Sequence, residues 1–518
     1  MTYNIFRSAL VVAACVGFTA CSLNEKLGDA LVRKDADSII KAPQLLQNAY
    51  NNLQYAYQDF SQTWGMSEMS TDEALGPTRG KDWDDNGVWR ELHEHKWTPD
   101  HAHINNSFKG LLLLQFSATN VLNFRPNPGQ EAEARFLRAL SIFSVLDLYG
   151  QVPFRNPTDT LLNAPKVMKP AEAIEFMKSE LTAVTPNLGN MPATQAYVAN
   201  KDAARFLLMK LYLNKGAFLN RQAPTFDAAD MQEIIKLADQ ITASGYKLAD
   251  NYYDNFARDN DVKSTENIFT QQNGPGFSTS RLPSANNVFC RWMCTLHYSQ
   301  RPSGWNGFTT LSDFYDKYEP TDKRLGGFYS GVTDTSGLKV GFLIGQQYDQ
   351  NGNKILDRSG RPLIFTREVQ LRATGDQVEM SGIRVVKYPP DFLTTKSTSE
   401  NGNDASNDFV FFRYADVLLM KAEALLRTGN APAALLLVNQ IRLKRGATPL
   451  AALDLNSLLD ERGRELYWEG WRRQDLIRFG KFLQPWQLKP TDDPKYLLFP
   501  IPTSDLAVNK NLVQNPGY

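Results

Sequence analysis

Residues 70–97 gather side chains that suit the binding of a ring-shaped polar ligand. Indole rings stand there beside carboxylates and an arginine, in a stretch without clean helical or strand alternation. A flat aromatic face packs on the C–H face of a sugar ring, while carboxylates and arginines bind its hydroxyl groups. The candidate ligand contacts are Trp83, Asp72, Arg79 and Asp82. Trp83 lies between charged residues and is expected to be exposed, whereas Trp89 and Trp97 are expected to pack inside the scaffold.

A second aromatic stretch, residues 290–308, reads CRWMCTLHYSQRPSGWNGF. Its candidate ligand contacts are Trp292, Tyr298, Arg301 and Trp305, with packing inside the loop as the alternative for the two tryptophans. Cys290 and Cys294 lie in the same stretch. They could form a disulfide if the backbone between them is not helical. Two partly buried free thiols are the alternative.

Two patterns resemble metal sites, but neither predicts one. Alternate histidines on a strand point the same way, as zinc ligands can, but the spacing of His93, His95, His101 and His103 fixes no such geometry. The sequence DWDDNG at residues 82–87 matches the start of a calcium loop, yet its twelfth position is histidine rather than glutamate. Turn-forming Asp and Asn explain the motif more simply, with bound calcium as the alternative.

Glu465 and Glu469 are the strongest candidates for catalysis, because they lie four residues apart on one helical face. Paired carboxylates are what glycosidases use, but those carboxylates flank the substrate from opposite sides. Charged residues surround the pair at helical spacing: Arg462, Arg464, Arg472, Arg473 and Asp475. Cations hold a carboxylate in its charged form, which a general acid must avoid. We therefore predict an ion-pair lattice and no enzymatic activity.

Amphipathic helices must position these loops. Apolar residues recur every three or four positions over residues 44–60, 108–123, 131–149, 170–188, 203–218 and 231–244. Helices joined by short turns suggest stacked hairpins of the tetratricopeptide kind. The clearest hairpin is RYADVLLMKAEALLRTGN followed by APAALLLVNQIRLKRG, with Gly429-Asn430 as its turn. The chain is thus predicted to be mainly α.

Between residues 252 and 408 the helical periodicity fades, and Gly, Ser, Asn and aromatic residues become frequent. Two turn signals, Asn351-Gly352 and Ser359-Gly360, are flanked by strand-like runs. We expect a loop-rich insertion with small β-hairpins. Long ordered loops in compact proteins are more often functional than linkers.

Composition excludes nucleic acid as a partner, because 56 basic and 56 acidic residues balance and give no overall positive field. Arg7 precedes an apolar run over residues 9–18, about half of the roughly 20 residues that span a bilayer. We predict a signal peptide over residues 1–20. Small residues before Cys21 indicate lipidation at that cysteine, with Cys15 as the alternative.

Several ordered motifs together resemble the SusD/RagB family. They are the hairpin at residues 413–446, ERGRELYWEGWRRQDLIRFGKF, LLFPIPTSDLAVNKNLVQNPGY, and, in the first half, ARFLRALSIFSVLDLYGQVPF. The resemblance divides the chain into a SusD-like N-terminal part at 21–251, a variable region at 252–408 and a C-terminal part at 409–518. It implies four tetratricopeptide-like hairpins as the scaffold.

The resemblance also implies a function. Such proteins are outer-membrane lipoproteins that form the lid over a TonB-dependent SusC-like transporter. Family members usually bind glycans, so capture of an oligosaccharide at the cell surface is the expected role. A peptide-capturing protein like those of the RagB branch and a helical glycoside hydrolase are the alternatives.

Overall fold

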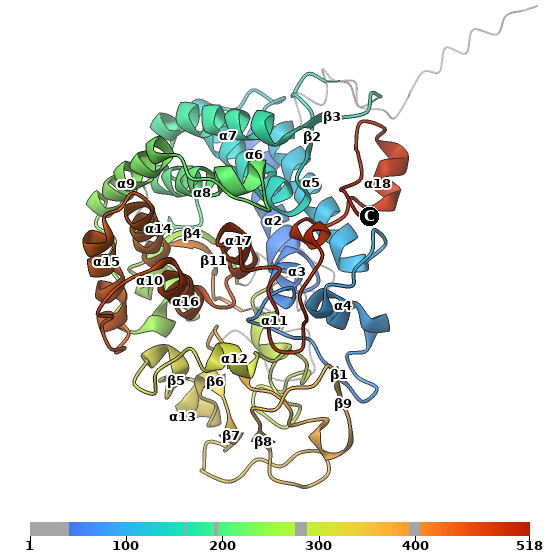
Figure 1. Cartoon of the computed structure of the whole chain (residues 1–518), viewed down its shortest axis with the longest axis vertical. Helices are drawn as coiled ribbons and strands as arrows, with labels where there is room; N and C mark the ends of the chain where they lie inside the picture. Colours follow the sequence, from blue (N-terminus) through green and yellow to red (C-terminus); the bar gives the residue numbers. More distant parts are fainter. Residues whose placement is uncertain (1–40, 160–161, 191–194, 275–286, 393–404) are drawn as a thin grey trace, which may run out of the picture. The chain divides into compact units, whose positions relative to one another are not determined.

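The computed structural model describes residues 41–518 except 160–161, 191–194, 275–286 and 393–404 (Figure 1). The predicted signal peptide and Cys21 lie outside these residues. Within the described part, no helix is long and apolar enough to cross a bilayer. Residues from Ala42 to Tyr518 form one compact unit.

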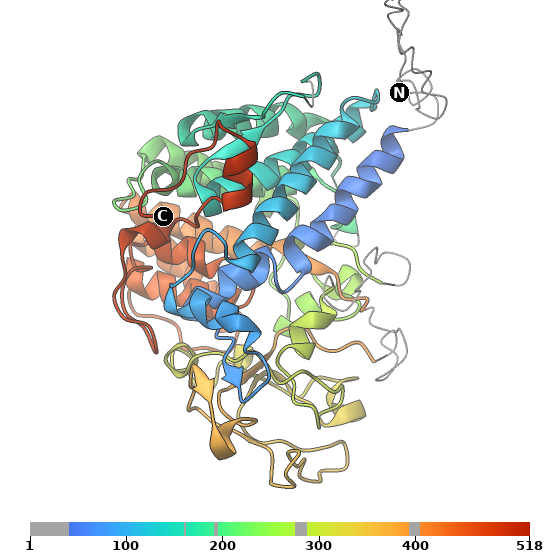
Figure 2. The same ribbon diagram turned by 90° about the vertical axis from the view of Figure 1, so that its right-hand side faces the viewer.

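A stack of helices forms the scaffold. Each helix packs on the next, from α2 on α5 through α6, α7, α8 and α9 to α14 and α15. Figure 2 shows α2 and α5 side by side. The helices are α2 (Ala42–Leu53), α5 (Ala102–Val121), α6 (Pro128–Tyr149), α7 (Pro170–Val184), α8 (Lys201–Leu219), α9 (Ala228–Ala243), α14 (Tyr414–Arg427) and α15 (Ala431–Lys444). The mainly α prediction with stacked hairpins is confirmed.

Local sequence explains where these helices begin and end. At α6, the Asn127 side chain accepts from the Gln130 backbone, and Gln130 bonds back to the Asn127 backbone, which is a capping box. Gly150, with φ of 73°, ends the helix in the left-handed conformation that glycine tolerates. In the α14–α15 hairpin, the Asn430 side chain accepts from the backbone of Ala433 and caps α15.

Shorter helices complete the scaffold and occur within the loop-rich region. They are α3 (Thr63–Met69), α4 (Val88–Glu94), α10 (Asn260–Lys263), α11 (Phe289–Met293), α12 (Ser312–Tyr315), α13 (Thr333–Ser336), α16 (Leu455–Leu466), α17 (Arg472–Arg478) and α18 (Thr503–Val508). Helix α16 packs on both α14 and α17, and α17 contacts α3. The two ends of the described chain therefore share one core.

Small sheets tie the loop-rich region to the scaffold. Strand β4 (Asn267–Gln271) pairs antiparallel with β11 (Phe409–Arg413), which leads directly into α14. In a three-stranded sheet, β6 (Val340–Leu343) lies between β10 (Arg384–Val386) and β5 (Gly326–Gly327). Two further pairs join β1 (Thr78–Arg79) to β9 (Arg372–Ala373), and β2 (Val152–Phe154) to β3 (Lys166–Met168). The predicted hairpin is present as β7 (Gly345–Gln346) and β8 (Ile364–Phe365), with both predicted turn glycines at positive φ.

Candidate functional site

An aromatic cluster links the N-terminal stretch of the chain to residues 305–308 of the loop-rich region. The ring of Phe308 lies 4.9 Å from Trp83 and 4.8 Å from Trp89, measured between centroids. Phe60 stacks on Trp89 and contacts Trp305 at 5.9 Å. Trp89 is buried, as predicted, whereas Trp83 and Trp305 remain half-buried. The cluster therefore holds two partly exposed indoles on a rigid aromatic base.

The backbone fixes Trp83 in one orientation. Its φ of 61° is left-handed, and its Nε1–H donates to the carbonyl of Trp305 at 2.7 Å. A Cβ atom on Gly307 would lie 2.3 Å from the indole ring. Only glycine leaves room for this contact, so the stretch at 305–308 and the loop at 80–87 form one surface.

Beside the indoles lies a polar group of Asp82, Tyr298 and Arg358. The Tyr298 hydroxyl donates to Asp82 Oδ2 at 2.8 Å. The Arg358 guanidinium lies over the Tyr298 ring, 4.1 Å from its centroid, and 3.6 Å from Asp82 Oδ2. The side chains of Arg358 and Asp82 are about half exposed, at 52% and 48%. Partial burial, together with the bond to Asp82, raises the pKa of Tyr298 to about 12, so its hydroxyl stays a donor.

The buried Glu379 holds the Arg358 side chain of this polar group in place. It accepts hydrogen bonds from the Arg358 side chain and backbone, and from His297 Nε2 at 2.8 Å. Burial opposes the charge on Glu379, but these bonds outweigh it and lower the pKa of the carboxyl. The negative charge anchors Arg358 over Tyr298, leaving acceptors and donors at the surface for hydroxyl groups.

Five of the predicted ligand residues meet here or nearby. Trp83, Asp82, Tyr298 and Trp305 form the surface, and Arg301 lies exposed in the same loop, donating to the carbonyl of Thr335 at 3.2 Å. Arg358 was not predicted from the sequence. Its position beside the Ser359-Gly360 turn was the available signal, because a turn places its neighbours at the surface.

Three predicted ligand residues are structural instead. Trp292 is fully buried in helix α11. Arg79 is 1% exposed and donates to the carbonyls of Gly307, Val378 and Ser381, and burial lowers its pKa to about 9. Asp72 makes a two-pronged ion pair with Arg472, at 2.7 Å for each bond. Burial contradicts the predictions for Trp292 and Arg79, because distant parts of the chain enclose them, whereas Asp72 is half-buried with its carboxylate committed to Arg472.

The structure also shows what the cysteines and histidines of the two sequence patterns do. Cys290 and Cys294 are buried free thiols, because the backbone between them is helical and the Cys294 N–H donates to the Cys290 carbonyl at 3.0 Å. The disulfide alternative is therefore wrong. His93, His101 and His95 bond to separate carbonyls, those of Gln487, Val88 and Ser70.

In the DWDDNG segment the three aspartate side chains point to different partners and do not converge on one point. Asp82 accepts from Tyr298, Asp84 pairs with Arg90 and Arg372, and Asp85 accepts from the indole of Trp89. Asp85 and Asn86 have positive φ, as expected of turn residues. Within the described residues, no group of three or more His, Cys, Asp or Glu side chains could hold a metal ion.

Glu465 and Glu469 lie in a buried ion-pair lattice. Arg413 bonds to both carboxylates, Arg324 and Arg445 bond to Glu465, and Lys387 bonds to Glu469 at 2.8 Å. Burial opposes the charge on Glu465, but the arginines outweigh it and hold its pKa well below the usual range. The lattice was predicted, yet its cations are not those adjacent in sequence, since Arg462 pairs with Asp416 and Asp475 instead.

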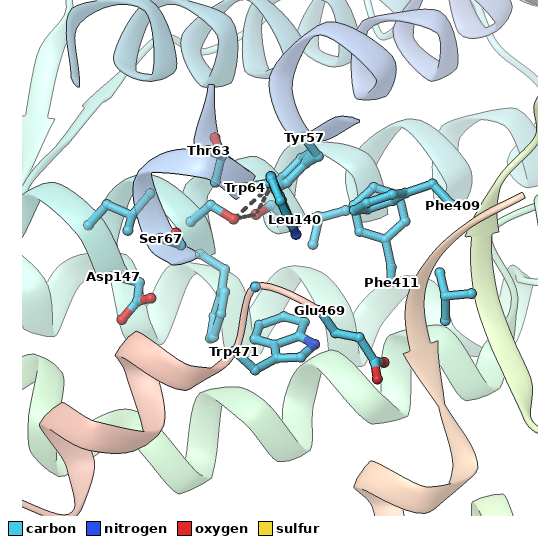
Figure 3. Close-up of a pocket in the computed structure, with 15 residues that line it drawn as sticks. Tyr57, Thr63, Trp64, Ser67, Leu140, Asp147, Phe409, Phe411, Glu469 and Trp471 are labelled. Atoms are coloured by element: carbon cyan, nitrogen blue, oxygen red, sulfur yellow. Dashed lines mark hydrogen bonds between the residues drawn. The ribbon is translucent and has the colours of Figure 1, made fainter. Parts of the chain in front are cut away.

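An internal cavity lies between α3, α6, β11 and the start of α17 (Figure 3). Its volume is about 60 Å³, far below the roughly 300 Å³ at which ligand pockets begin. Its polar groups have partners: the Tyr57 hydroxyl bonds to Ser144 at 2.7 Å, and Glu469 belongs to the lattice. The open surface around Trp83 and Tyr298 is therefore the better candidate.

Comparison with known proteins identifies the family. The model of the SusD family matches residues 256–518. The starch-binding protein SusD of Bacteroides thetaiotaomicron is 25% identical over 487 residues, which is 88% of this chain and 85% of the relative. A laminarin-binding SusD-like protein superposes with a TM-score of 0.69 at 19% identity, covering 92% of this chain and 99% of its own.

A second solved structure agrees with this fold. Surface glycan-binding protein A of Bacteroides thetaiotaomicron, in complex with laminarihexaose, has a TM-score of 0.67 at 17% identity, covering 92% of this chain and 98% of its own. The resemblance seen in the sequence is confirmed: this chain belongs to the SusD family.

Proposed function

We propose that this protein captures oligosaccharides at the cell surface and delivers them to a TonB-dependent SusC-like transporter. One observation carries the proposal: half-buried Trp83 and Trp305 stand beside the hydrogen-bonding group of Asp82, Tyr298 and Arg358. Aromatic faces and planar hydrogen-bonding groups together are what a sugar ring needs. The starch-binding and laminarin-binding relatives support the same ligand class.

The protein acts by binding, without chemistry on the glycan. The paired carboxylates Glu465 and Glu469 are buried among cations, so neither can reach a substrate or hold a proton to donate. The names of the relatives also describe binding proteins. Lipidation at Cys21 would tether this binding surface to the outer membrane, and two or more acyl chains give stable anchoring.

Calorimetry of the purified protein tests the ligand class. Laminarihexaose, a starch-derived maltooligosaccharide and a set of short peptides are titrated in turn. We expect heat from at least one saccharide, and loss of that heat in Trp305→Ala. If peptides give heat and no saccharide does, the protein is the peptide-capturing alternative. Release of reducing ends from a polysaccharide would contradict the binding-only role.

The transporter partner needs a separate test. The chain is tagged at its C-terminus and purified from detergent-solubilised outer membranes of its own host. We expect a TonB-dependent barrel protein to copurify in stoichiometric amount. A Cys21→Ser variant, which removes the predicted lipidation site, should leave the membrane fraction while a Cys290→Ser control remains in it.

A further inference from the structure

An open groove lies on the scaffold, between the C-terminal half of α5 and the β2–β3 hairpin. We call it the α5 groove. It has a volume of about 280 Å³, close to the lower end of the range for small-ligand sites. The lining residues that matter for the argument are Gln115, Phe116, Thr119 and Asn120 of α5, together with Asn123 in the turn that follows the helix.

The α5 groove carries an aromatic face in the open. Phe116 is 48% exposed, although the helix that carries it packs on α2 and α6 along its other sides. Asn120 follows Phe116 one turn later on the same helix face, and Asn123 lies in the turn after the helix; both are half-buried. The groove thus repeats the combination of a ring face and neighbouring hydrogen-bonding groups seen around Trp83.

A buried amide gives an independent sign of a ligand. Gln115 is only 7% exposed and lines the groove, yet its Nε2 has no hydrogen-bond partner in the described part of the chain. Buried donors in proteins almost always have an acceptor. A hydroxyl group entering the groove would supply one.

The charges of the groove select against a strongly charged ligand. The charged residues lining it are Arg155 and Asp159, which have opposite signs. Asp159 already accepts from the backbone of Asn156 at 2.8 Å, and Arg155 donates to the carbonyl of Asn163. A neutral ligand with several hydroxyl groups fits this lining better than a polyanion or a basic peptide.

We infer that the α5 groove is a second saccharide-binding site, which holds a neutral sugar unit of the same polymer. This inference rests on the proposed function. Helix α5 connects the two surfaces: His103 in its first turn lies 4.3 Å from the Trp89 ring, beneath Trp83. Phe116 follows thirteen residues later, or about 20 Å along the helix axis. Figure 2 shows α5 running from there away from the loop-rich region drawn in yellow and orange.

Two linked sites would favour polymers over short oligosaccharides. Once one site holds a chain, the other meets the same chain at a high effective concentration. Phe116→Ala should therefore weaken retention by starch or laminarin in affinity electrophoresis on the order of tenfold. Binding of a trisaccharide at the Trp83 surface should stay unchanged. Leu113→Ala is the matched control, because Leu113 is 43% exposed on the same helix but does not line the groove.

The Tyr298→Ala variant separates this inference from the proposed function. In that background we expect weak residual retention by the polymer, which Phe116→Ala or Gln115→Leu then abolishes and Leu113→Ala preserves. If Phe116→Ala and Leu113→Ala behave alike in both backgrounds, the second site is refuted and the Trp83 surface stands. If the unaltered protein binds no saccharide, the proposed function and this inference fall together.

Discussion

At the scale of single residues, Tyr298 contributes both a hydrogen-bonding hydroxyl and an aromatic ring to the surface. Its hydroxyl is committed to Asp82, and its ring supports the guanidinium of Arg358. Arg358 is anchored in turn by Glu379, whose carboxyl is buried below. Tyr298 is therefore a positioning residue for two exposed, charged groups as well as part of the aromatic surface.

Replacing Tyr298 should damage binding more than folding. In Tyr298→Ala, Asp82 loses its donor and Arg358 loses the ring beneath it. We therefore expect glycan affinity to fall by roughly 1–3 kcal/mol, the range for truncating an aromatic residue that stacks on a nucleic-acid base. Calorimetry measures the affinity, and thermal unfolding checks stability. Tyr348→Ala is the control, because Tyr348 is 45% exposed outside this surface. Equal affinities for both variants would contradict the role of Tyr298.

Glu68 and Glu73 form a buried acid pair that the proposed function does not use. Glu68 accepts from the backbone of Gly470, and Glu73 Oε2 accepts from the backbone of Trp468 at 3.0 Å. Both carboxyls are fully enclosed. Burial raises the pKa of Glu68 to about 7, and burial together with the charge of Glu68 raises the pKa of Glu73 well above its usual value. The native state thus holds protons that the unfolded chain would release.

This pair predicts a stability that falls with rising pH. A carboxyl with a raised native pKa stabilises the fold fully below its unfolded value near 4.5, and that contribution is lost as pH rises through about 7. Glu68→Gln mimics the protonated acid, so we expect it to be more stable than the wild type at pH 8 by roughly 1–3 kcal/mol, with a smaller difference at pH 5. Urea unfolding at both pH values measures this.

Glu465 is a buried carboxyl whose pKa is shifted in the opposite direction from those of Glu68 and Glu73. Its pKa is lowered by three arginines despite burial, so its charged form stabilises the fold. Glu465→Gln should therefore destabilise the protein most at neutral pH and progressively less in acid, because protonation removes the same charge. If the two glutamine variants show the same pH dependence, the assignment of the shared protons to Glu68 and Glu73 is wrong.

At the scale of elements, the stretch at 305–308 fits against the loop at 80–87 through one glycine. A methyl group on Gly307 would lie 2.3 Å from the Trp83 indole and 2.8 Å from the Cys294 carbonyl. The carbonyl belongs to the backbone and cannot yield easily. The two segments therefore form one continuous surface only when residue 307 lacks a side chain.

Gly307→Ala should separate these two segments. We expect a stability loss of about 1–3 kcal/mol, typical of overpacking, and weaker glycan binding because Trp83 must move. A shift in tryptophan fluorescence should accompany both effects. Gly352→Ala is a useful comparison: Gly352 has positive φ, but nothing lies within 4 Å of its missing side chain, so backbone strain appears there without the clash. Unchanged binding in Gly307→Ala would show that Trp83 is not part of the surface.

Helices were predictable from sequence to a degree that the site residues were not. The helix at 170–184 is predicted by its apolar spacing and by a proline in its first turn, which are local signals. Burial of a loop residue depends on partners far along the chain. Asp72 meets Arg472, 400 positions away, and Trp83 rests on Gly307. The sequence therefore did not separate buried Trp292 from half-buried Trp305, although it did place Trp89 inside the scaffold.

At the scale of the molecule, the buried ion-pair lattice connects the loop-rich region to the helical scaffold. Glu266, Arg324 and Lys387 come from the loop-rich region, whereas Arg445 and Glu465 come from the ends of scaffold helices. Arg413 stands at the centre, at the junction of β11 and α14, and bonds to Glu266, Glu465 and Glu469. The loop-rich region and the scaffold are thus expected to unfold together.

Arg413→Gln tests this coupling. Removing one partner from a buried ion pair leaves uncompensated charge, so we expect a loss of about 3–5 kcal/mol in the free energy of unfolding. Lys236→Gln is the surface control: its pair with Glu233 is 61% and 44% exposed, and its loss should cost less than about 1 kcal/mol. Far-ultraviolet circular dichroism follows the helices, and hydrogen exchange of the backbone amides in residues 78–87 and 290–308 follows the aromatic loops. Because the lattice joins both parts, the two urea midpoints should fall together in Arg413→Gln. If the loops unfold at lower urea than the helices in Arg413→Gln but not in the wild type, Arg413 itself couples the two regions. If neither midpoint changes in Arg413→Gln, the lattice does not stabilise the fold and its proposed role is refuted.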